Sequence, residues 1–243
     1  MTPILNELVT VSSLPLAAVE TSFSVDSSGF GVSGKKTWRD VKYGNGEEWH
    51  DWVKAHVIVG NITKVIISAV ITPAYKADSP FLPPLIEKTA KYFRLEEVMA
   101  DAAYSSRANL ELIEGHNAQA LIAFRANAVF GKNGEAWDRR LHAWKYHFDE
   151  VHERYRFRSN AETAFSSLKA VFGSNLRSRS DTGRVNELLA KIICHNLRAL
   201  IRATYELNID IDLSKASAQA SAASIQPGQG ACCREKRFVK AFL

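Results

Sequence analysis

Three segments in the first third of the chain are rich in β-branched and aromatic residues and are separated by Gly, Asn and Ser. These segments are TSFSVDSSGF (21–30), WVKAHVIVGN (52–61) and KVIISAVITPAY (64–75). Short segments of this composition, bounded by turn-forming residues, are typical of β-strands. The pattern therefore predicts three consecutive strands.

The hydrophobic pattern then alternates between helical spacing and short apolar runs. FLPPLIEKTAKYF (81–93) and SSRANLELIEGH (105–116) have helical spacing, whereas LEEVMADAAY (95–104) and QALIAFRAN (119–127) are strand-like. A Ser at the start of 105–116 and a Gly near its end are typical helix boundaries. Three strands followed by alternating helix and strand predict an α/β fold, with a mixed sheet of about five strands flanked by helices.

From Gly131 onward the pattern is mainly helical. A connector rich in Gly, Ser and Arg, GSNLRSRSDTGR (173–184), precedes a long predicted helix at 185–207. That helix carries an apolar face that we expect in the core, made of Leu188, Leu189, Ile192, Ile193, Leu197, Leu200 and Ile201. We expect residues 1–20 to form a short helix and linker, residues 21–208 the main domain, and the Ala- and Ser-rich residues 209–243 a low-complexity, disordered tail.

The segment YRFRSNAETAFSSLK (155–169) places four functional side chains at helical intervals. Its composition, without Gly or Pro, favours a helix, and Tyr155, Arg158, Glu162 and Lys169 would then share one narrow stripe. An adjoining apolar stripe would pack on the core and consists of Phe157, Ala161, Ala164, Phe165, Leu168 and Phe172. The pattern predicts one carboxylate held at the margin of the core between two cations and a phenol.

Two further carboxylates occupy informative positions in the predicted sheet. Asp26 lies within the first strand and points away from the face covered by Phe23 and Val25, while Asp101 ends the fourth strand. If these strands are neighbours and the helix of Glu162 crosses them, three carboxylates converge. Mg²⁺ or Mn²⁺, as a pair of ions, would relieve their repulsion and support phosphodiester chemistry. The alternatives are that Asp101 caps a helix and that Glu162 pairs with Arg158 on a helix surface.

Charge is distributed unevenly along the chain. The net charge is +5, and between Gly131 and Arg202 14 Lys and Arg residues stand against 8 Asp and Glu residues. The basic excess therefore surrounds the segment of Glu162 and suits a polyanion, although a solvated surface would look the same. Three cysteines without disulfide or zinc spacing and the absence of a long apolar run favour a cytoplasmic protein with no membrane partner.

Four blocks of the sequence together resemble DDE-class insertion-sequence transposases. YRFRSNAETAFSSLK resembles the family's Tyr, Arg, Glu and Lys signature, SVDSSGFG and ADAAYSSRANLELI are similar to its two aspartate blocks, and LRSRSDTGRVNELLAKIICHNLRALI is similar to the segment that follows. The resemblance runs from about residue 21 to residue 208. It implies an RNase H-like domain in which Asp26, Asp101 and Glu162 bind two divalent metal ions.

The resemblance also implies an activity and partners. Family members cut a DNA strand at the end of an insertion sequence and use the exposed 3′-hydroxyl to attack target DNA. Tyr155, Arg158 and Lys169 would position double-stranded DNA, which includes both the element ends and the target. The resemblance also implies a homodimer that holds the two paired ends and is associated with the nucleoid when bound to DNA. Only 25 residues precede Asp26, fewer than in most relatives, and the tail is unlike theirs. We therefore also consider a truncated copy that binds DNA without cutting, and a nuclease or resolvase of the same fold that cuts without strand transfer.

Overall fold

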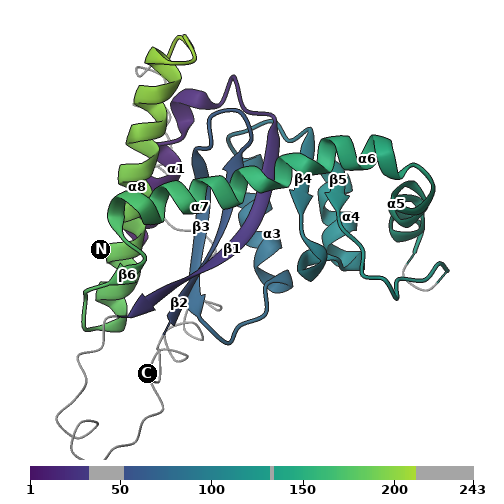
Figure 1. Ribbon diagram of the computed structural model, residues 1–243, viewed down its shortest axis with the longest axis horizontal. Coiled ribbons are helices and arrows are strands. Elements are labelled where there is room, and N and C mark those ends of the chain that lie inside the picture. Colours follow the sequence, from purple (N-terminus) through teal and green to yellow (C-terminus); the bar gives the residue numbers. More distant parts are fainter. Residues whose placement is uncertain (33–51, 132–133, 212–243) are drawn as a thin grey trace, which may run out of the picture.

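The computed structural model describes residues 1–32, 52–131 and 134–211, and its centre is a mixed β-sheet (Figure 1). Five strands follow the order β3-β2-β1-β4-β5, and the short β6 pairs with the end of β1. The strands are β1 Ser22–Val32, β2 Trp52–Gly60, β3 Ile66–Pro73, β4 Glu97–Ala100, β5 Gln119–Ile122 and β6 Asn175–Leu176. The five predicted strands are all present, whereas β6 lies in a segment predicted to be a connector.

Strand directions divide the sheet into two parts. β1, β2 and β3 form an antiparallel meander, whereas β4 runs parallel to β1 and β5 runs parallel to β4. This order and these directions are consistent with the RNase H-like fold, so the predicted fold class is confirmed. β1 is central in the sheet, with β2 on one side and β4 on the other.

The fourth and fifth strands are shorter than predicted. β4 ends at Ala100 because Asp101 begins a 3₁₀ turn, η3 Ala102–Tyr104, and accepts a hydrogen bond from the Ala103 N–H at 2.8 Å. The apolar residues after Ala100 therefore leave the sheet. As predicted, the next helix, α4 Arg107–Gly115, begins after a capping Ser106 whose hydroxyl accepts from the Asn109 N–H at 3.2 Å.

Helices cover both faces of the sheet. One core cluster joins Phe23 and Val25 of β1 to α4 and to α3 Leu82–Ala90. The other joins Phe30 of β1 to α7 Ser159–Phe172 and α8 Asp181–Tyr205. Figure 1 shows α7 crossing the sheet and α8 lying beside it, with α5 Glu135–Tyr146 and α6 Phe148–Tyr155 beyond β5. Asp26 is thus on the face that α7 covers, because its side chain alternates with Val25.

The segment from Tyr155 to Phe172 is not the single α-helix that we predicted. α6 ends at Tyr155, a 3₁₀ turn, η4 Arg156–Arg158, follows, and α7 begins at Ser159. A 3₁₀ turn has about three residues per turn instead of 3.6, so it rotates the preceding side chains away from the stripe extrapolated from α7. Phe157 is accordingly 46% exposed and does not belong to the buried apolar face. The other predicted members of that face are buried or partly buried.

The C-terminal half of α8 also departs from prediction. Leu197 and Ile201 are exposed, at 50% and 60%, while His195, Asn196, Ala199 and Ala203 are buried instead. Asn196 explains part of this orientation, since its amide donates to the carbonyls of Val9 and Ile66 and thereby joins α8 to β3 and to α1 Thr2–Val11. The expected tail lies outside the described residues from 212 onward. Within the described ranges, no helix is both long enough and apolar enough to cross a membrane.

Candidate active site

Asp26 and Asp101 lie at the junction of the two central parallel strands. The parallel pairing of β1 and β4 runs up to Val25 opposite Ala100, so Asp26 and Asp101 are the next residue along each strand. Asp26 also pairs with Val57 of β2, which fixes the strand on its other side. The first and fourth strands are therefore neighbours, which was the condition for the carboxylates to converge. It brings together two carboxylates that are 75 positions apart in the sequence.

The start of α7 is attached directly above this junction. The hydroxyl of Ser24 donates to the carbonyl of Phe157 at 3.1 Å, and the amide of Asn160 donates to the carbonyl of Asn61 at 3.1 Å. The side chains of α7 that face the sheet here include the small, buried Ala161 and Ala164, which let the helix backbone approach the strands closely. Glu162, in the first turn of α7, is thereby held over β1.

The three carboxylates share one electrostatic environment. The pKa of Asp26 is raised to about 6, chiefly by burial and also by the negative charges of Asp101 and Glu162. A hydrogen bond from the backbone of Ser27 and the positive charge of Arg158 oppose this rise. Such mutual repulsion is the condition that a bound cation relieves. Their oxygen-only donor set also suits Mg²⁺ or Mn²⁺ better than a softer metal.

Both structural alternatives considered for these acids occur in the structure. Asp101 caps η3 through one of its two carboxylate oxygens, and Glu162 forms a salt bridge with Arg158, four residues earlier. With the side chains in these positions, no three Asp, Glu, His or Cys residues of the described ranges lie close enough together to hold one metal ion. The donor chemistry therefore fits a divalent cation, whereas the carboxylate of Glu162 is engaged by a protein cation.

Lys169 and Tyr155 flank the carboxylates in different ways. Lys169 donates to the hydroxyl of Ser28 at 2.8 Å and lies over the ring of Phe30, so it contacts β1 two residues beyond Asp26. Burial lowers the pKa of this lysine. Tyr155 packs edge-on against Trp144, with ring centroids 5.1 Å apart. Burial raises the pKa of its phenol, and the charge of Arg158 opposes that rise.

A polar cluster on the opposite side of β1 was not predicted from the sequence. One oxygen of Asp78 accepts from Lys54 at 2.6 Å and from the hydroxyl of Ser27 at 3.1 Å, and His56 Nδ1 lies 3.4 Å away. Ser27 follows Asp26, so this cluster holds the strand that carries the candidate site. No spacing in the sequence signals the cluster, because Asp78 comes from the segment after β3 and its partners come from β1 and β2.

The strand order and directions are consistent with an RNase H-like domain, and Asp26 and Asp101 each follow the last residue pair between its two central parallel strands. Comparison with known families agrees with this class, since the family model described as a transposase DDE domain matches residues 18–197. That range covers about three quarters of the chain and includes β1, β4 and α7. The chain belongs to this family of transposase domains.

Proposed function

We propose that this chain is a transposase that cuts a DNA strand and joins the exposed 3′-hydroxyl to target DNA in a metal-dependent reaction. The observation that carries the proposal is the position of Asp26 and Asp101, each directly after the last residue pair of β1 and β4, with both Asp101 and Glu162 acting electrostatically on Asp26. Membership of the transposase DDE family supports the same activity. The basic excess around α7 suits a DNA substrate.

In this proposal, Asp26, Asp101 and Glu162 hold the divalent ions, and each residue around them has a separate part. Two such ions, when bound, activate the attacking oxygen and stabilise the leaving oxygen of a phosphodiester. Arg158 suits the bidentate binding of a phosphate once Glu162 is released from it. Lys169 would hold the strand as a point charge beside β1, and Tyr155 would support the position of Arg158 from the end of α6.

A second candidate is a DNA-binding domain that does not cut. The salt bridge between Arg158 and Glu162 favours it, because a stable pair would keep that carboxylate from a metal ion. The two candidates differ in one property, since both bind DNA but only the transposase consumes it. A nuclease of the same fold would cut DNA without producing joined strands.

The test is nicking of plasmid DNA in Mg²⁺ or Mn²⁺ by the wild type beside Asp26→Asn, Asp101→Asn and Glu162→Gln. We expect the wild type to nick and the three variants to lose nicking while they retain salt-sensitive DNA binding. Glu111→Gln is the matched control, because Glu111 on α4 also pairs with an arginine four residues earlier, Arg107. Full nicking by all three variants would refute the site assignment.

Strand transfer requires a separate measurement. A labelled oligonucleotide with a free 3′-hydroxyl should become covalently joined to plasmid DNA by a transposase. Nicking without such a product would identify a nuclease or resolvase. Metal-independent binding without nicking by the wild type would favour the DNA-binding candidate.

A further inference from the structure

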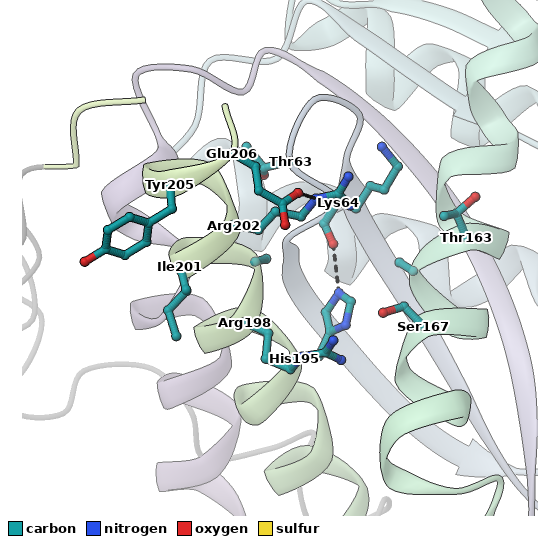
Figure 2. Close-up of a pocket in the computed structure, with 12 residues that line it drawn as sticks. Thr63, Lys64, Thr163, Ser167, His195, Arg198, Ile201, Arg202, Tyr205 and Glu206 are labelled. Atoms are coloured by element: carbon teal, nitrogen blue, oxygen red, sulfur yellow. Dashed lines mark hydrogen bonds and ion pairs between the residues drawn. The ribbon is translucent and has the colours of Figure 1, made fainter. Parts of the chain in front are cut away.

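A pocket of about 410 Å³ lies between α7 and α8, and the turn between β2 and β3 closes one end of it (Figure 2). We call it the α7–α8 pocket. Its polar lining includes Lys64, Thr163, Ser167, His195, Arg198 and Arg202. None of these residues has a part in the proposed cleavage, and the pocket lies beside the helix that carries Glu162.

The pocket carries a net positive charge. Arg202 is paired with Glu206, where its Nε donates at 2.7 Å. Among the described residues, by contrast, no acidic side chain pairs with Lys64 or Arg198. Two uncompensated cations in a lining that also holds the hydroxyl of Ser167 form a site for an anionic group that can accept several hydrogen bonds.

The turn that carries Lys64 is held by buried polar contacts. Glu20 is fully buried and accepts hydrogen bonds from the Thr63 N–H at 2.6 Å, the Thr63 hydroxyl at 2.7 Å and the Ile62 N–H at 3.1 Å. Lys64 itself has a φ of 62°, a left-handed conformation that is uncommon for a lysine. Backbone strain of this kind persists only where surrounding contacts impose it, and it is concentrated at functional sites.

His195 holds the same turn from the side of α8. Its Nε2 lies 3.0 Å from the carbonyl oxygen of Lys64, and the side chain is almost completely buried. Since a carbonyl can only accept, Nε2 carries the proton. Nδ1 is then a buried acceptor that has no hydrogen-bond partner in the protein. His195 therefore fixes the position of Lys64 and leaves one polar atom of the lining unsatisfied.

The α7–α8 pocket is adjacent to the candidate active site. Thr163 directly follows Glu162, so the pocket and the carboxylate lie on neighbouring sides of one helix. A helix with its side chains is about 10–12 Å across. A DNA strand advances about 3.4 Å per nucleotide. If a strand crosses α7, the phosphate at the pocket is therefore only a few nucleotides from the phosphodiester at the candidate active site.

We propose that the α7–α8 pocket binds a backbone phosphate of the DNA strand, a few nucleotides from the phosphodiester that lies at Asp26, Asp101 and Glu162. This inference rests on the proposed function, because it assigns a second contact for the same substrate. Lys64 and Arg198 contact the phosphate, and the hydroxyl of Ser167 donates a hydrogen bond to it, whereas the hydroxyl of Thr163 already donates to the Ser159 carbonyl at 3.0 Å. The charges and the hydroxyl of the lining suit a phosphate of the DNA backbone.

The test measures binding of a labelled DNA duplex at salt concentrations between about 50 and 200 mM. Lys64→Gln and Arg198→Gln should each weaken binding several-fold and reduce the slope of log K against log salt by about 1, since each removes one phosphate contact. Lys91→Gln is the matched control, because Lys91 is exposed and follows α3 on the other face of the sheet. Equal slopes for all three variants would refute the proposal.

A charge-preserving variant separates the pocket from the general electrostatic field. Ser167→Leu fills part of the pocket and leaves every cation in place. We therefore expect this variant to bind DNA more weakly while its melting temperature equals that of the wild type. Wild-type affinity in Ser167→Leu would overturn the assignment. A thermal shift with inorganic phosphate that Arg198→Gln abolishes, at unchanged DNA affinity, would instead identify a small-anion site and would also overturn it.

The pocket and the proposed function can fail independently. If the wild type nicks DNA and Glu162→Gln does not, but the pocket variants bind as the wild type does, only the pocket assignment is wrong. If the pocket variants lose affinity while the wild type does not nick DNA, the pocket assignment stands and cleavage is refuted.

Discussion

Arg158 binds the carboxylate of Glu162 across one helical turn, at the junction between η4 and α7. The side chain of Arg158 is 23% exposed and that of Glu162 is 53% exposed, so the pair lies at the margin of the core. A divalent ion and Arg158 would therefore compete for the same carboxylate. Arg158 also lowers the pKa of Asp26, which places its charge near the second acid.

The first prediction concerns this competition. Arg158→Ala should lower the Mg²⁺ or Mn²⁺ concentration needed for half-maximal thermal stabilisation by about twofold to fivefold, because partly exposed ion pairs contribute about 0.5–1 kcal/mol. Differential scanning fluorimetry across a metal titration measures the midpoint. Arg107→Ala, which breaks the similarly spaced pair with Glu111, should leave the midpoint unchanged. A weaker metal response in Arg158→Ala would show that the arginine supports the metal site instead.

The second prediction separates DNA contact from metal binding at Lys169. Lys169→Met retains an unbranched side chain over Phe30 but removes the charge that reaches Ser28. We expect DNA affinity to fall several-fold, with the salt slope reduced by about 1, while the midpoint of the metal titration changes less than about twofold. Lys91→Met controls for the loss of one positive charge. A shifted metal midpoint at unchanged DNA affinity would mean that Lys169 acts on the carboxylates.

The sheet and the position of Asp26 were predictable because strand patterns are local. Alternation along residues 21–30 places the side chain of Asp26 on the other face of the strand from Phe23 and Val25. The turn residues between the apolar segments mark where each strand ends. The adjacency of β1 and β4 could only be stated as a condition from the sequence, because strand pattern does not show which strands pair. The helix boundary at residues 156–158 was not predictable, since 3₁₀ turns are frequent at the ends of α-helices and no Gly or Pro marks this one.

Contacts that join distant segments had no sequence signal. The bond between His195 and the Lys64 carbonyl links residues 131 positions apart, and that between Asn196 and Ile66 links residues 130 apart. From apolar spacing alone, we predicted that Leu197 and Ile201 of the 185–207 helix lie in the core of the protein. The buried polar side chains of His195 and Asn196 face β3 and its preceding turn instead, which turns Leu197 and Ile201 outward.

The third prediction follows from the buried His56. Its pKa is lowered to about 4, chiefly by burial and also by the charge of Lys54, while the charge of Asp78 opposes the shift. The neutral ring is favoured in the folded protein, so between pH 6.5 and about 4 the unfolded chain binds more protons. The contribution of the neutral His56 ring to the free energy of unfolding is complete above about pH 6.5 and is lost as pH falls toward 4. This contribution is on the order of 3 kcal/mol.

Urea unfolding at a series of pH values tests this linkage. The free energy of unfolding should fall from pH 6.5 toward pH 4 in the wild type, and it should fall less steeply in His56→Gln, which cannot titrate. His116→Gln, at an exposed position after α4, should follow the wild-type slope. Parallel slopes for the wild type and His56→Gln would show that other groups cause the acid sensitivity.

The last prediction concerns the contact between Gly60 and Glu20 beneath the turn of Lys64. A Cβ at Gly60 would lie 2.6 Å from Glu20 Oε1 and 2.8 Å from Glu20 Cγ, so Gly60→Ala must displace a buried carboxylate that accepts three hydrogen bonds. Overpacking of this kind costs about 1–3 kcal/mol, and urea unfolding should show that loss. Gly115→Ala, whose Cβ meets nothing within 4 Å at the end of α4, should be neutral or slightly stabilising.

Because Glu20 holds the turn that carries Lys64, Gly60→Ala should also weaken DNA binding at temperatures where the protein remains folded. Wild-type stability in Gly60→Ala would mean that Glu20 moves aside without loss, and that this contact does not fix the turn.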